Sequence, residues 1–259
     1  MRIGISTGCL YPHTTMDSLE KLLCEGFGVF EIFFNTVSEM ENDQLDKIKM
    51  MLNRYSASVV SIHPFSSAFE SFLLFSKYTR RFEDGVRMYG SYFRAAARLG
   101  ADKLVIHGMK DDFAVLDIEG YSRRFARLCS EGEKWGVSVL QENVDRHCAN
   151  RPDFLRGMAG YIPPQSGFVL DVKQALRGGY DPCELMHIMG SGLKHIHISD
   201  STDGKNCLLP GKGDFDYCRF FRELKKCGYD GDIIIEVYGT SYKELSEIKK
   251  SKDFLESFI

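Results

Sequence analysis

The 259-residue sequence contains no apolar run long enough to span a membrane and no C-x-x-C pair among its eight cysteines. The first absence argues against a membrane protein, because a spanning helix needs about 20 consecutive apolar residues. The second argues against a zinc ribbon or a thioredoxin-like redox site. We therefore expect reduced, mostly buried thiols in a cytoplasmic protein, at positions 9, 24, 129, 148, 183, 207, 218 and 227.

Excess positive charge is also absent. Lys and Arg number 33 against 36 for Asp and Glu, so the formal net charge is -3. No global positive field would draw the chain to a phosphate backbone, and nucleic acid is not an expected partner. The start "MRIGIST" runs straight into a strand-like segment without an apolar leader, so we expect no secretory signal.

Short runs rich in Val and Ile recur along the chain, and the segments between them are long enough for helices. Eight strands and eight helices in about 250 residues predict an α/β fold, a single (β/α)8 TIM barrel that forms one domain over residues 1–259. A doubly wound sheet is less favoured, because no glycine-rich nucleotide fingerprint follows the first strand. The predicted strands are 2–7, 29–34, 59–64, 103–108, 137–143, 167–172, 194–199 and 232–237.

Helical patterns fill the intervening segments. Phe82, Val86, Tyr89, Phe93 and Ala97 share one helical face, and further helices are predicted near 120–135, 152–159, 181–189, 216–227 and 242–257. The longest connection, "PFSSAFESFLLFSKYTRRFEDG", follows the third strand and mixes serines with Phe65, Phe69, Phe72 and Phe75. It is interpreted either as a short extra helix on the barrel rim or as an aromatic lid over an active site.

Six consecutive predicted strands carry an acid or a histidine near their C-terminal ends, where such barrels build their active sites. Because only 36 Asp and Glu and 7 His occur among 259 residues, six of six at matching positions exceeds what a purely structural barrel requires. Grouped at one mouth, these side chains would repel one another or shift their pKa values unless a cation stood between them. The six are His63, His107, Glu142, Asp171, His197 and Glu236.

Four of these residues are the expected metal ligands: Glu142, Asp171, His197 and Glu236. Three carboxylates and one imidazole, with no thiolate, favour one divalent ion, Mn²⁺ first, with Mg²⁺, Co²⁺ or Zn²⁺ as alternatives. His63 and His107 are expected to hydrogen-bond substrate oxygens instead.

The stretch "KHIHISD" places two histidines on the same face of the seventh strand, because side chains alternate between the two faces of a strand. His197 lies nearer the mouth and is the expected ligand, whereas His195 lies one layer deeper as a hydrogen-bonded core residue. Asp200, just past the strand, is expected to cap the next loop or to orient a ligand imidazole.

The motifs "SIHP", "LVIHG", "LQEN", "FVLD", "HISD", "LPGKGDFD" and "IIIEVYG" occur in this order on successive strands and loops. In their order and spacing, the chain resembles the xylose isomerase-like TIM barrel superfamily over essentially its full length. That superfamily contains sugar and sugar-phosphate isomerases and epimerases, and the endonuclease IV type of DNA repair enzyme. The resemblance to the ketose 3-epimerase branch implies one metal on the four residues named above, with Glu142 and Glu236 as acid and base on opposite faces of the substrate.

The chain departs from the endonuclease branch of this superfamily. There, histidines matching His63 and His107 help hold further zinc ions, and a third metal requires a histidine three residues after the aspartate and an Asp-x-His element after strand 7. Position 174 is Gln174, and "DGKNCLLPGKGD" contains no Asp-x-His. The resemblance therefore implies no full trinuclear zinc site, which disfavours phosphodiester cleavage. Because isomerase branches often keep a histidine at that position, Gln174 is expected to hydrogen-bond a sugar hydroxyl instead.

Two lysines complete the predicted substrate site. If the sixth strand continues, Lys173 faces the same way as Asp171 and contacts a substrate oxygen or an anionic group; otherwise it is a solvated loop lysine. Lys212 lies in "PGKGD" after the seventh strand, where barrels often bind phosphate. The alternative for this loop is a glycine turn that leads into a helix near Asp216.

These residues predict a metal-dependent isomerase or epimerase that acts on a sugar, a sugar phosphate or a related polyhydroxy carbonyl compound. Proton removal beside a carbonyl forms an enediolate, whose negative oxygens a divalent cation stabilises, with Glu142 and Glu236 as base and acid. The alternatives are a lyase or dehydratase on the same scaffold, an endonuclease IV-like phosphodiesterase and a non-catalytic sugar-binding module. The expected partner is a small sugar, with no nucleic acid and no membrane; assembly into a homo-oligomer is left open.

Overall fold

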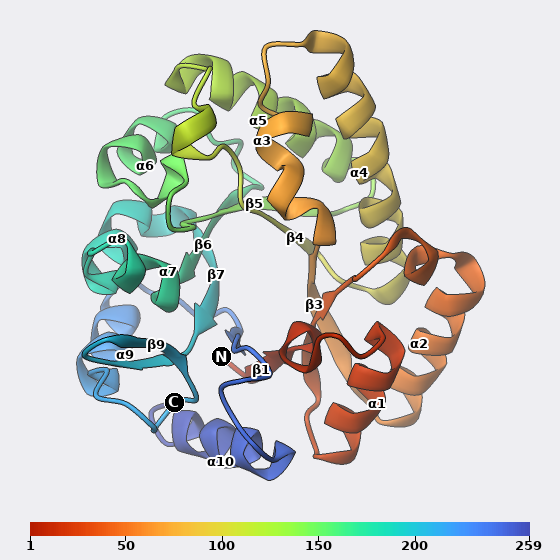
Figure 1. Cartoon of the computed structure of the whole chain (residues 1–259), viewed down its shortest axis with the longest axis vertical. Helices are drawn as coiled ribbons and strands as arrows, with labels where there is room; N and C mark the ends of the chain where they lie inside the picture. Colours follow the sequence, from red (N-terminus) through yellow and green to blue (C-terminus); the bar gives the residue numbers. More distant parts are fainter.

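The computed structural model describes all 259 residues. Eight parallel strands form a closed barrel in the order β1-β10-β7-β6-β5-β4-β3-β2, and helices surround it (Figure 1). The prediction of a (β/α)8 barrel is confirmed, because every predicted strand lies in the barrel. In the structure, the bounds of the eight barrel strands are β1 Ile3–Ser6, β2 Val29–Phe33, β3 Ser58–His63, β4 Lys103–Ile106, β5 Ser138–Glu142, β6 Gly167–Asp171, β7 Leu193–Ile198 and β10 Ile233–Ile235.

Eight helices form the outer ring: α1 Thr15–Cys24, α2 Asn42–Arg54, α4 Thr79–Leu99, α5 Ile118–Glu133, α6 Pro152–Ala159, α8 Pro182–Met189, α9 Tyr217–Lys226 and α10 Leu245–Glu256. Two short helices, α3 Glu70–Leu73 and α7 Val172–Arg177, are additional, as is an antiparallel hairpin between β7 and α9, β8 Asp200–Thr202 and β9 Lys205–Leu208. None of these helices combines the length and apolar composition needed to cross a bilayer.

Short 3-10 turns occur in the connections and before β7: Thr7–Leu10, Val37–Met40, Phe65–Phe69, Asp111–Phe113, Cys148–Asn150 and Gly190–Gly192. All eight cysteines are free, and five are buried: Cys9, Cys129, Cys148, Cys183 and Cys207.

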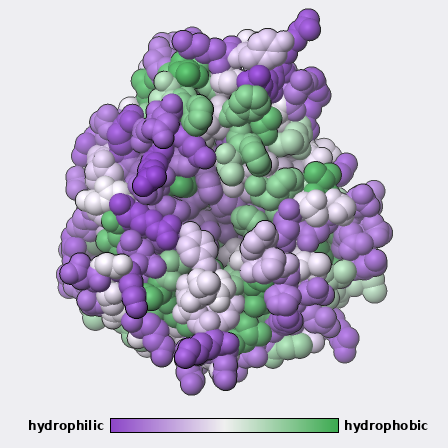
Figure 2. All heavy atoms as spheres, in the orientation of Figure 1, coloured by the Kyte–Doolittle hydropathy of each residue, from purple (hydrophilic) through white to green (hydrophobic).

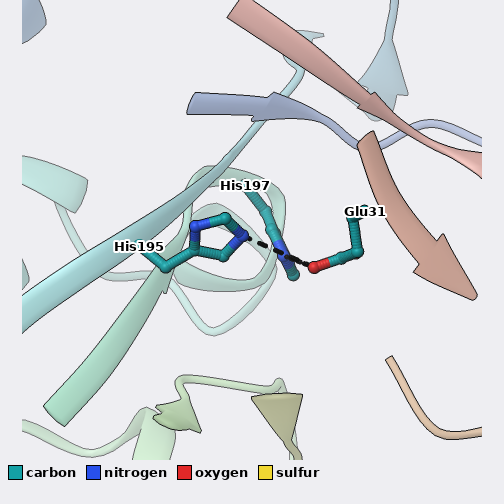
Figure 3. A group of neighbouring side chains, drawn as sticks. All are labelled: Glu31, His195 and His197. Atoms are coloured by element: carbon teal, nitrogen blue, oxygen red, sulfur yellow. Dashed lines mark hydrogen bonds and ion pairs between the residues drawn. The ribbon is translucent and has the colours of Figure 1, made fainter. Parts of the chain in front are cut away.

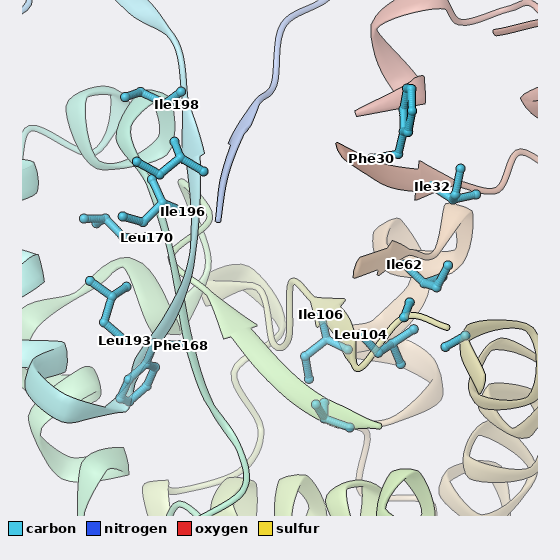
Figure 4. Packing of buried hydrophobic residues seen from close by; sticks show 14 of the residues in the cluster. Phe30, Ile32, Ile62, Leu104, Ile106, Phe168, Leu170, Leu193, Ile196 and Ile198 are labelled. Carbon is cyan, nitrogen blue, oxygen red and sulfur yellow. The ribbon is translucent and has the colours of Figure 1, made fainter. Parts of the chain in front are cut away.

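The main core lies between the strands and the ring of helices. Alternation along each strand sends bulky apolar side chains outward, as Figure 4 shows for residues of β2, β3, β4, β6 and β7. Inside the barrel the apolar clusters are small: Val29, Val60 and Ile234 form one, and Val105, Leu140 and Val169 form another. The inside of the barrel above these clusters is therefore free for polar side chains.

The barrel closes between the first and last strands, where Ile3 pairs with Ile233 and Gly4 with Ile234. Position 4 has to be glycine, because a Cβ atom there would lie 2.7 Å from both the Val29 carbonyl oxygen and the Ile234 side chain. Arg2 joins the same two strands through the Asp232 carboxylate, with its Nη2 2.6 Å from Oδ2 and its Nε 2.9 Å from Oδ1. This two-point contact secures the start of both strands.

The long connection after β3 contains a short helix packed on the rim. Glu70 in α3 is fully buried, and its carboxylate accepts hydrogen bonds from the Tyr89 hydroxyl at 2.6 Å and from the Gly108 N–H at 2.5 Å. Phe75 is buried, whereas Phe69 and Phe72 are exposed. The prediction of an extra rim helix is confirmed, and closure of this segment as a lid stays a prediction.

We predict that the Asp232 ion pair contributes a pH-dependent part of the stability. Burial alone would raise the pKa of Asp232. The hydrogen bonds and positive charge of Arg2 lower it by a larger amount, so the pKa of Asp232 lies below its usual value. The contribution is therefore present above about pH 4 and is lost as the pH falls through the lowered folded-state pKa. Because Arg2 is half exposed, we expect D232N to reduce the free energy of unfolding by about 1 kcal/mol at neutral pH.

Urea denaturation of the wild type and D232N, repeated from about pH 7 down to about pH 3, measures this difference. The gap between the two proteins should narrow as the pH falls. A gap that stays constant over this range would contradict the assignment.

Candidate metal centre

The ends of three neighbouring strands and the residue after a fourth bring the predicted ligands together. Glu142 ends β5, Asp171 ends β6, His197 is the next-to-last residue of β7, and Glu236 follows β10 directly. The pairing of the strands places His197 level with both Asp171 and Ile234. As a result, one donor atom from each of the four residues lies within 4.8 Å of the others.

The imidazole of His197 lies among the three carboxylates. Its Nδ1 is 3.5 Å from Glu142 Oε1, 3.6 Å from Glu236 Oε2 and 3.9 Å from Asp171 Oδ2. Glu142, Asp171 and His197 are almost fully buried, whereas the Glu236 side chain is 20% exposed. The cluster is thus reached from the side of Glu236.

Two of the facing atoms, Asp171 Oδ2 and His197 Nδ1, make no hydrogen bond, and neither does the other oxygen of Glu142, Oε2. Leaving buried polar atoms unpaired costs about 1–3 kcal/mol each, so a group that binds them is expected at this point. Three carboxylates and one imidazole nitrogen suit a hard divalent cation such as Mn²⁺ or Mg²⁺, with Co²⁺ or Zn²⁺ also compatible. The residues present therefore fit a divalent metal ion.

Lys173 reaches this cluster by a different route from the predicted one. The strand does not continue past Asp171, because Asp171 Oδ1 accepts a hydrogen bond from the Gln174 N–H and caps helix α7. The expected strand-like orientation of Lys173 is therefore wrong, but its Nζ still lies 2.5 Å from Glu236 Oε2 and 3.2 Å from Asp171 Oδ2. Lys173 is buried, so it is not a solvated loop lysine.

Burial and neighbouring charges act in different directions on the carboxylates. Burial raises the pKa of Asp171 well above its usual value, despite the opposing charge of Lys173. Burial also favours a higher pKa for Glu236, but the charges of Lys173 and His197 outweigh it and lower the pKa to about 2. Lys173 itself loses hydration on burial, yet Asp171 and Glu236 hold its pKa well above the usual range. One ammonium thus stabilises two of the three acids.

His63 and His107 contact the third acid from the other side. The Nε2 atom of His107 is 3.2 Å from Glu142 Oε2, and that of His63 is 3.7 Å from the same oxygen. These three residues form a second group whose donor atoms lie within 4.8 Å of one another. Burial would raise the pKa of Glu142, but His107, His197 and His63 together hold it well below its usual range.

A deeper network lies beneath His197 and was missed by the sequence analysis. Figure 3 shows the imidazoles of His195 and His197 facing one carboxylate oxygen of Glu31, from β2. Glu31 Oε2 also accepts a hydrogen bond from the Ser61 hydroxyl at 2.8 Å. The prediction of His195 as a hydrogen-bonded core residue is confirmed, since it is fully buried with Nε2 3.1 Å from Ser61 Oγ.

Asp200 determines the shape of the glycine-rich loop after β9. Its carboxylate accepts hydrogen bonds from the backbone N–H groups of Gly211, Gly213 and Phe215, and from that of Ser201. A phosphate bound in this loop would need the same N–H groups, and the Asp200 carboxylate already occupies them. The loop leads into α9, whose N-cap is Asp216, as the turn interpretation predicts.

The structure does not bring every predicted substrate residue to the cluster. Lys212 is exposed, and it belongs neither to the ligand group nor to the cavity beside it. Gln174 is close to the cluster through its N–H bond to Asp171, but its Oε1 accepts a hydrogen bond from the Asp145 N–H at 3.2 Å.

A cavity of about 450 Å³ opens beside Glu236 at the barrel mouth. Figure 2 shows this face hollowed near its centre, with hydrophilic residues in the hollow and hydrophobic residues on its rim. Aromatic rings form much of the cavity wall, and no lysine, arginine or histidine lines it. The lining residues are Ser6, Gly8, Tyr11, Phe33, Asn35, Phe65, Glu236, Val237 and Tyr238.

The chain is similar to an uncharacterised protein over most of its length and to two enzymes over shorter stretches. An uncharacterised protein from Mycobacterium leprae is 22% identical over 271 residues, 95% of this chain and 92% of that protein. A ketose 3-epimerase from Arthrobacter globiformis is 26% identical over 119 residues, 44% of this chain and 40% of the enzyme. An inosose dehydratase from Geobacillus kaustophilus is 31% identical over 84 residues, 26% of this chain and 27% of the enzyme.

Solved structures and a family model cover far more of the chain. The crystal structure of a D-tagatose 3-epimerase-like protein superposes with a TM-score of 0.83 at 20% identity, covering 100% of this chain and 97% of the other, which shows a shared fold. The sequence model described as xylose isomerase-like TIM barrel matches residues 19–258. Because that match spans almost the whole sequence, the chain belongs to the xylose isomerase-like TIM barrel family.

Proposed function

We propose that this protein is a metal-dependent isomerase or epimerase of a sugar or a related polyhydroxy carbonyl compound. The observation that carries the proposal is the meeting of Glu142, Asp171, His197 and Glu236 at the barrel mouth, with buried donor atoms that have no hydrogen-bond partner. The similarity to a ketose 3-epimerase supports the same class of reaction.

Glu142 and Glu236 are the proposed acid and base, because they approach the cluster from different strands. The lowered pKa values of both favour the ionised form that a base needs, so the glutamate that acts as the acid has to take up a proton first. One removes a proton from the carbon beside the carbonyl, and the other returns a proton to the opposite face or to the neighbouring carbon. A bound divalent cation supplies stabilisation for the negative charge that develops on the substrate oxygens. Asp171 and His197 are proposed to act as ligands only.

The substrate oxygens are proposed to be held by groups around this centre. His63 and His107 lie on the Glu142 side of it, and Lys173 on the Glu236 side. Gln174, next to Lys173, presents an amide instead of a titratable group. Together these side chains offer donors around a carbonyl and its neighbouring hydroxyls.

The proposed substrate is not phosphorylated. The cavity beside Glu236 has a carboxylate and aromatic rings in its wall but no cationic side chain. Asp200 also occupies the backbone N–H groups of the loop that contains Lys212. A phosphate in the cavity would lose its hydration without gaining a counter-charge from the wall, and a phosphate at the loop would find these N–H groups already bound.

A dehydratase is the second candidate, because part of the chain is similar to an inosose dehydratase. Removal of a proton beside a carbonyl is also the first step of eliminating water. An endonuclease has one observation in its favour, the grouping of His63, His107 and Glu142. The donor set expected for a third zinc ion is absent, because position 174 is glutamine and the loop after β7 contains no Asp-x-His.

We predict that the purified protein binds one Mn²⁺ per chain and that H197Q binds it at least about 100-fold more weakly. The loss should exceed the 10–100-fold that is typical when only an outer partner of a ligand is removed. Isothermal titration calorimetry of the metal-stripped proteins measures both affinities. H187Q is the matched control, since His187 is half exposed and lies against Glu223 on the outside of the barrel. Equal affinities of H197Q and the wild type would contradict the ligand assignment.

We predict that the enzyme exchanges a carbon-bound proton of its substrate with solvent. NMR spectroscopy in heavy water, with a panel of ketoses, aldoses and cyclic polyol ketones, should show deuterium incorporation. At saturating metal, E142Q and E236Q should each lower the rate by about 10²–10⁴-fold, because each removes one proton-transfer group. E184Q is the control, since Glu184 is exposed on α8.

The products separate the candidates. An unsaturated product formed with loss of water would favour the dehydratase, and cleavage of abasic DNA without exchange on any sugar would favour the endonuclease. Tight sugar binding without turnover, unchanged in E142Q, would favour a binding module.

We predict that an unphosphorylated substrate has a kcat/KM at least about 10-fold higher than its terminal phosphate ester, because the cavity lacks a counter-charge for the phosphate. K212A should change the KM for neither compound by more than about twofold, because the loop N–H groups around it are bound to Asp200. Steady-state kinetics of the wild type and K212A on both compounds tests this. A preference for the phosphate that K212A abolishes would show that the loop does bind phosphate.

A further inference from the structure

We infer that Glu31 is a positioning residue of the metal centre, which fixes the orientation of His197 and the ring nitrogen that carries its hydrogen. The inference rests on the proposed function only in that it concerns the same metal site. Neither the motifs nor the predicted strand ends pointed to this residue, which lies in the middle of β2.

The contacts of Glu31 all converge on one oxygen. Its Oε2 lies 3.0 Å from His197 Nε2 and 3.4 Å from His195 Nε2, and it accepts a hydrogen bond from Ser61 at 2.8 Å. Glu31, His195 and His197 are all buried, with exposed fractions of 0%, 0% and 1%. The contact from Glu31 to His197 is therefore shielded from water, and no solvent molecule competes for the imidazole at this nitrogen.

The chemistry of the two partners determines which nitrogen of His197 carries hydrogen. An ionised carboxylate can only accept hydrogen bonds, so Nε2 has to be the protonated nitrogen of the ring. The lone pair of the neutral imidazole is then on Nδ1, which is the atom that faces Glu142, Glu236 and Asp171. Glu31 thereby presents His197 to the centre in the form that binds a metal ion.

A buried carboxylate at this position needs an explanation other than packing. Other positions inside the barrel are filled by Val105, Leu140 and Val169, and an apolar residue in place of Glu31 would avoid the cost of burying a charge. The second oxygen of Glu31, Oε1, has no hydrogen-bond partner, so the surrounding residues leave half of the carboxylate without a hydrogen bond. The arrangement does serve His197.

Glu31, His195 and His197 also meet the distance condition for a metal site of their own. Two observations favour hydrogen bonding instead. The nitrogen-to-oxygen distances of 3.0 and 3.4 Å are those of direct contacts, and the full burial of all three residues provides no entry path for an ion. A second ion here would also take the Nε2 of His197 while the first takes its Nδ1. The metal stoichiometry distinguishes the two arrangements.

The test compares metal binding by the wild type, E31Q and E70Q. Glutamine keeps the size of the side chain and removes the charge, and we expect E31Q to bind Mn²⁺ about 10–100-fold more weakly. Glu70 is the matched control, because it is an equally buried carboxylate whose hydrogen bonds go to Tyr89 and Gly108 and not to a metal ligand. E70Q should keep the wild-type affinity even if its stability falls. The Co²⁺-loaded proteins should show an altered visible absorption spectrum for E31Q only.

A double-mutant cycle shows whether Glu31 acts through His197. If it does, E31Q should cause no further loss of affinity in the H197Q background. Additive losses, or wild-type affinity and spectrum in E31Q, would overturn the inference and leave the proposed function intact. Two equivalents of metal per wild-type chain, with one lost in E31Q, would also overturn it. If the wild type binds no metal, the proposed metal centre itself fails.

NMR spectroscopy of the zinc-loaded wild type tests the same inference without any variant, so its outcome does not depend on whether E31Q folds. Long-range ¹⁵N–¹H correlation distinguishes the two nitrogens of each imidazole. We expect His197 to carry its hydrogen on Nε2. A ring with its hydrogen on Nδ1 would contradict the positioning role of Glu31.

Discussion

The organisation of the barrel mouth depends on the burial of like charges. Glu142, Asp171 and Glu236 have donor atoms within 4.8 Å of one another, and two of the three residues are almost fully buried. With all three acids ionised, as metal ligands have to be, Lys173 supplies one positive charge, which leaves two negative charges to be balanced. One divalent cation would supply that charge, and Glu142, Asp171 and His197, which have buried atoms without a hydrogen-bond partner, would be among its ligands. Charge balance and ligand geometry thus favour the same group.

The inside of the barrel supports this centre in layers. Small clusters of valine, leucine and isoleucine lie on the inner face, Glu31, Ser61 and His195 form a polar network beneath His197, and the ligand group lies at the mouth. The bulky residues of the core lie outside, between strands and helices (Figure 4). Changes in the outer core should therefore affect stability first, whereas changes in the inner layers should affect the site.

Much of the fold and of the ligand group could be predicted, because in a parallel barrel the C-terminal ends of all strands lie at the same mouth. Once eight strands were recognised, residues such as Glu142 and Asp171 at matching strand ends had to meet at one mouth. Glu31 was missed because it lies within its strand, whereas the predicted ligands lie at or near strand ends; its signal was a lone acid in the apolar run "VFEIFF". Helix α7 was missed because Asp171 is both the last residue of β6 and the N-cap of α7. The apolar strand pattern that ends at Asp171 does not show that a helix begins directly after it.

The family scaffold alone does not determine the reaction. The residues around the proposed metal ligands narrow the choice of reaction. At position 174, where isomerase branches often keep a histidine, this chain has glutamine, which can donate and accept hydrogen bonds but does not exchange a proton near neutral pH. Lys173 is held by two carboxylates that keep it charged, so it is a poor base. In the proposed reaction, proton transfer beside a carbonyl therefore falls to the two glutamates, and Glu236, which borders the cavity, is the one that a substrate in the cavity would reach directly.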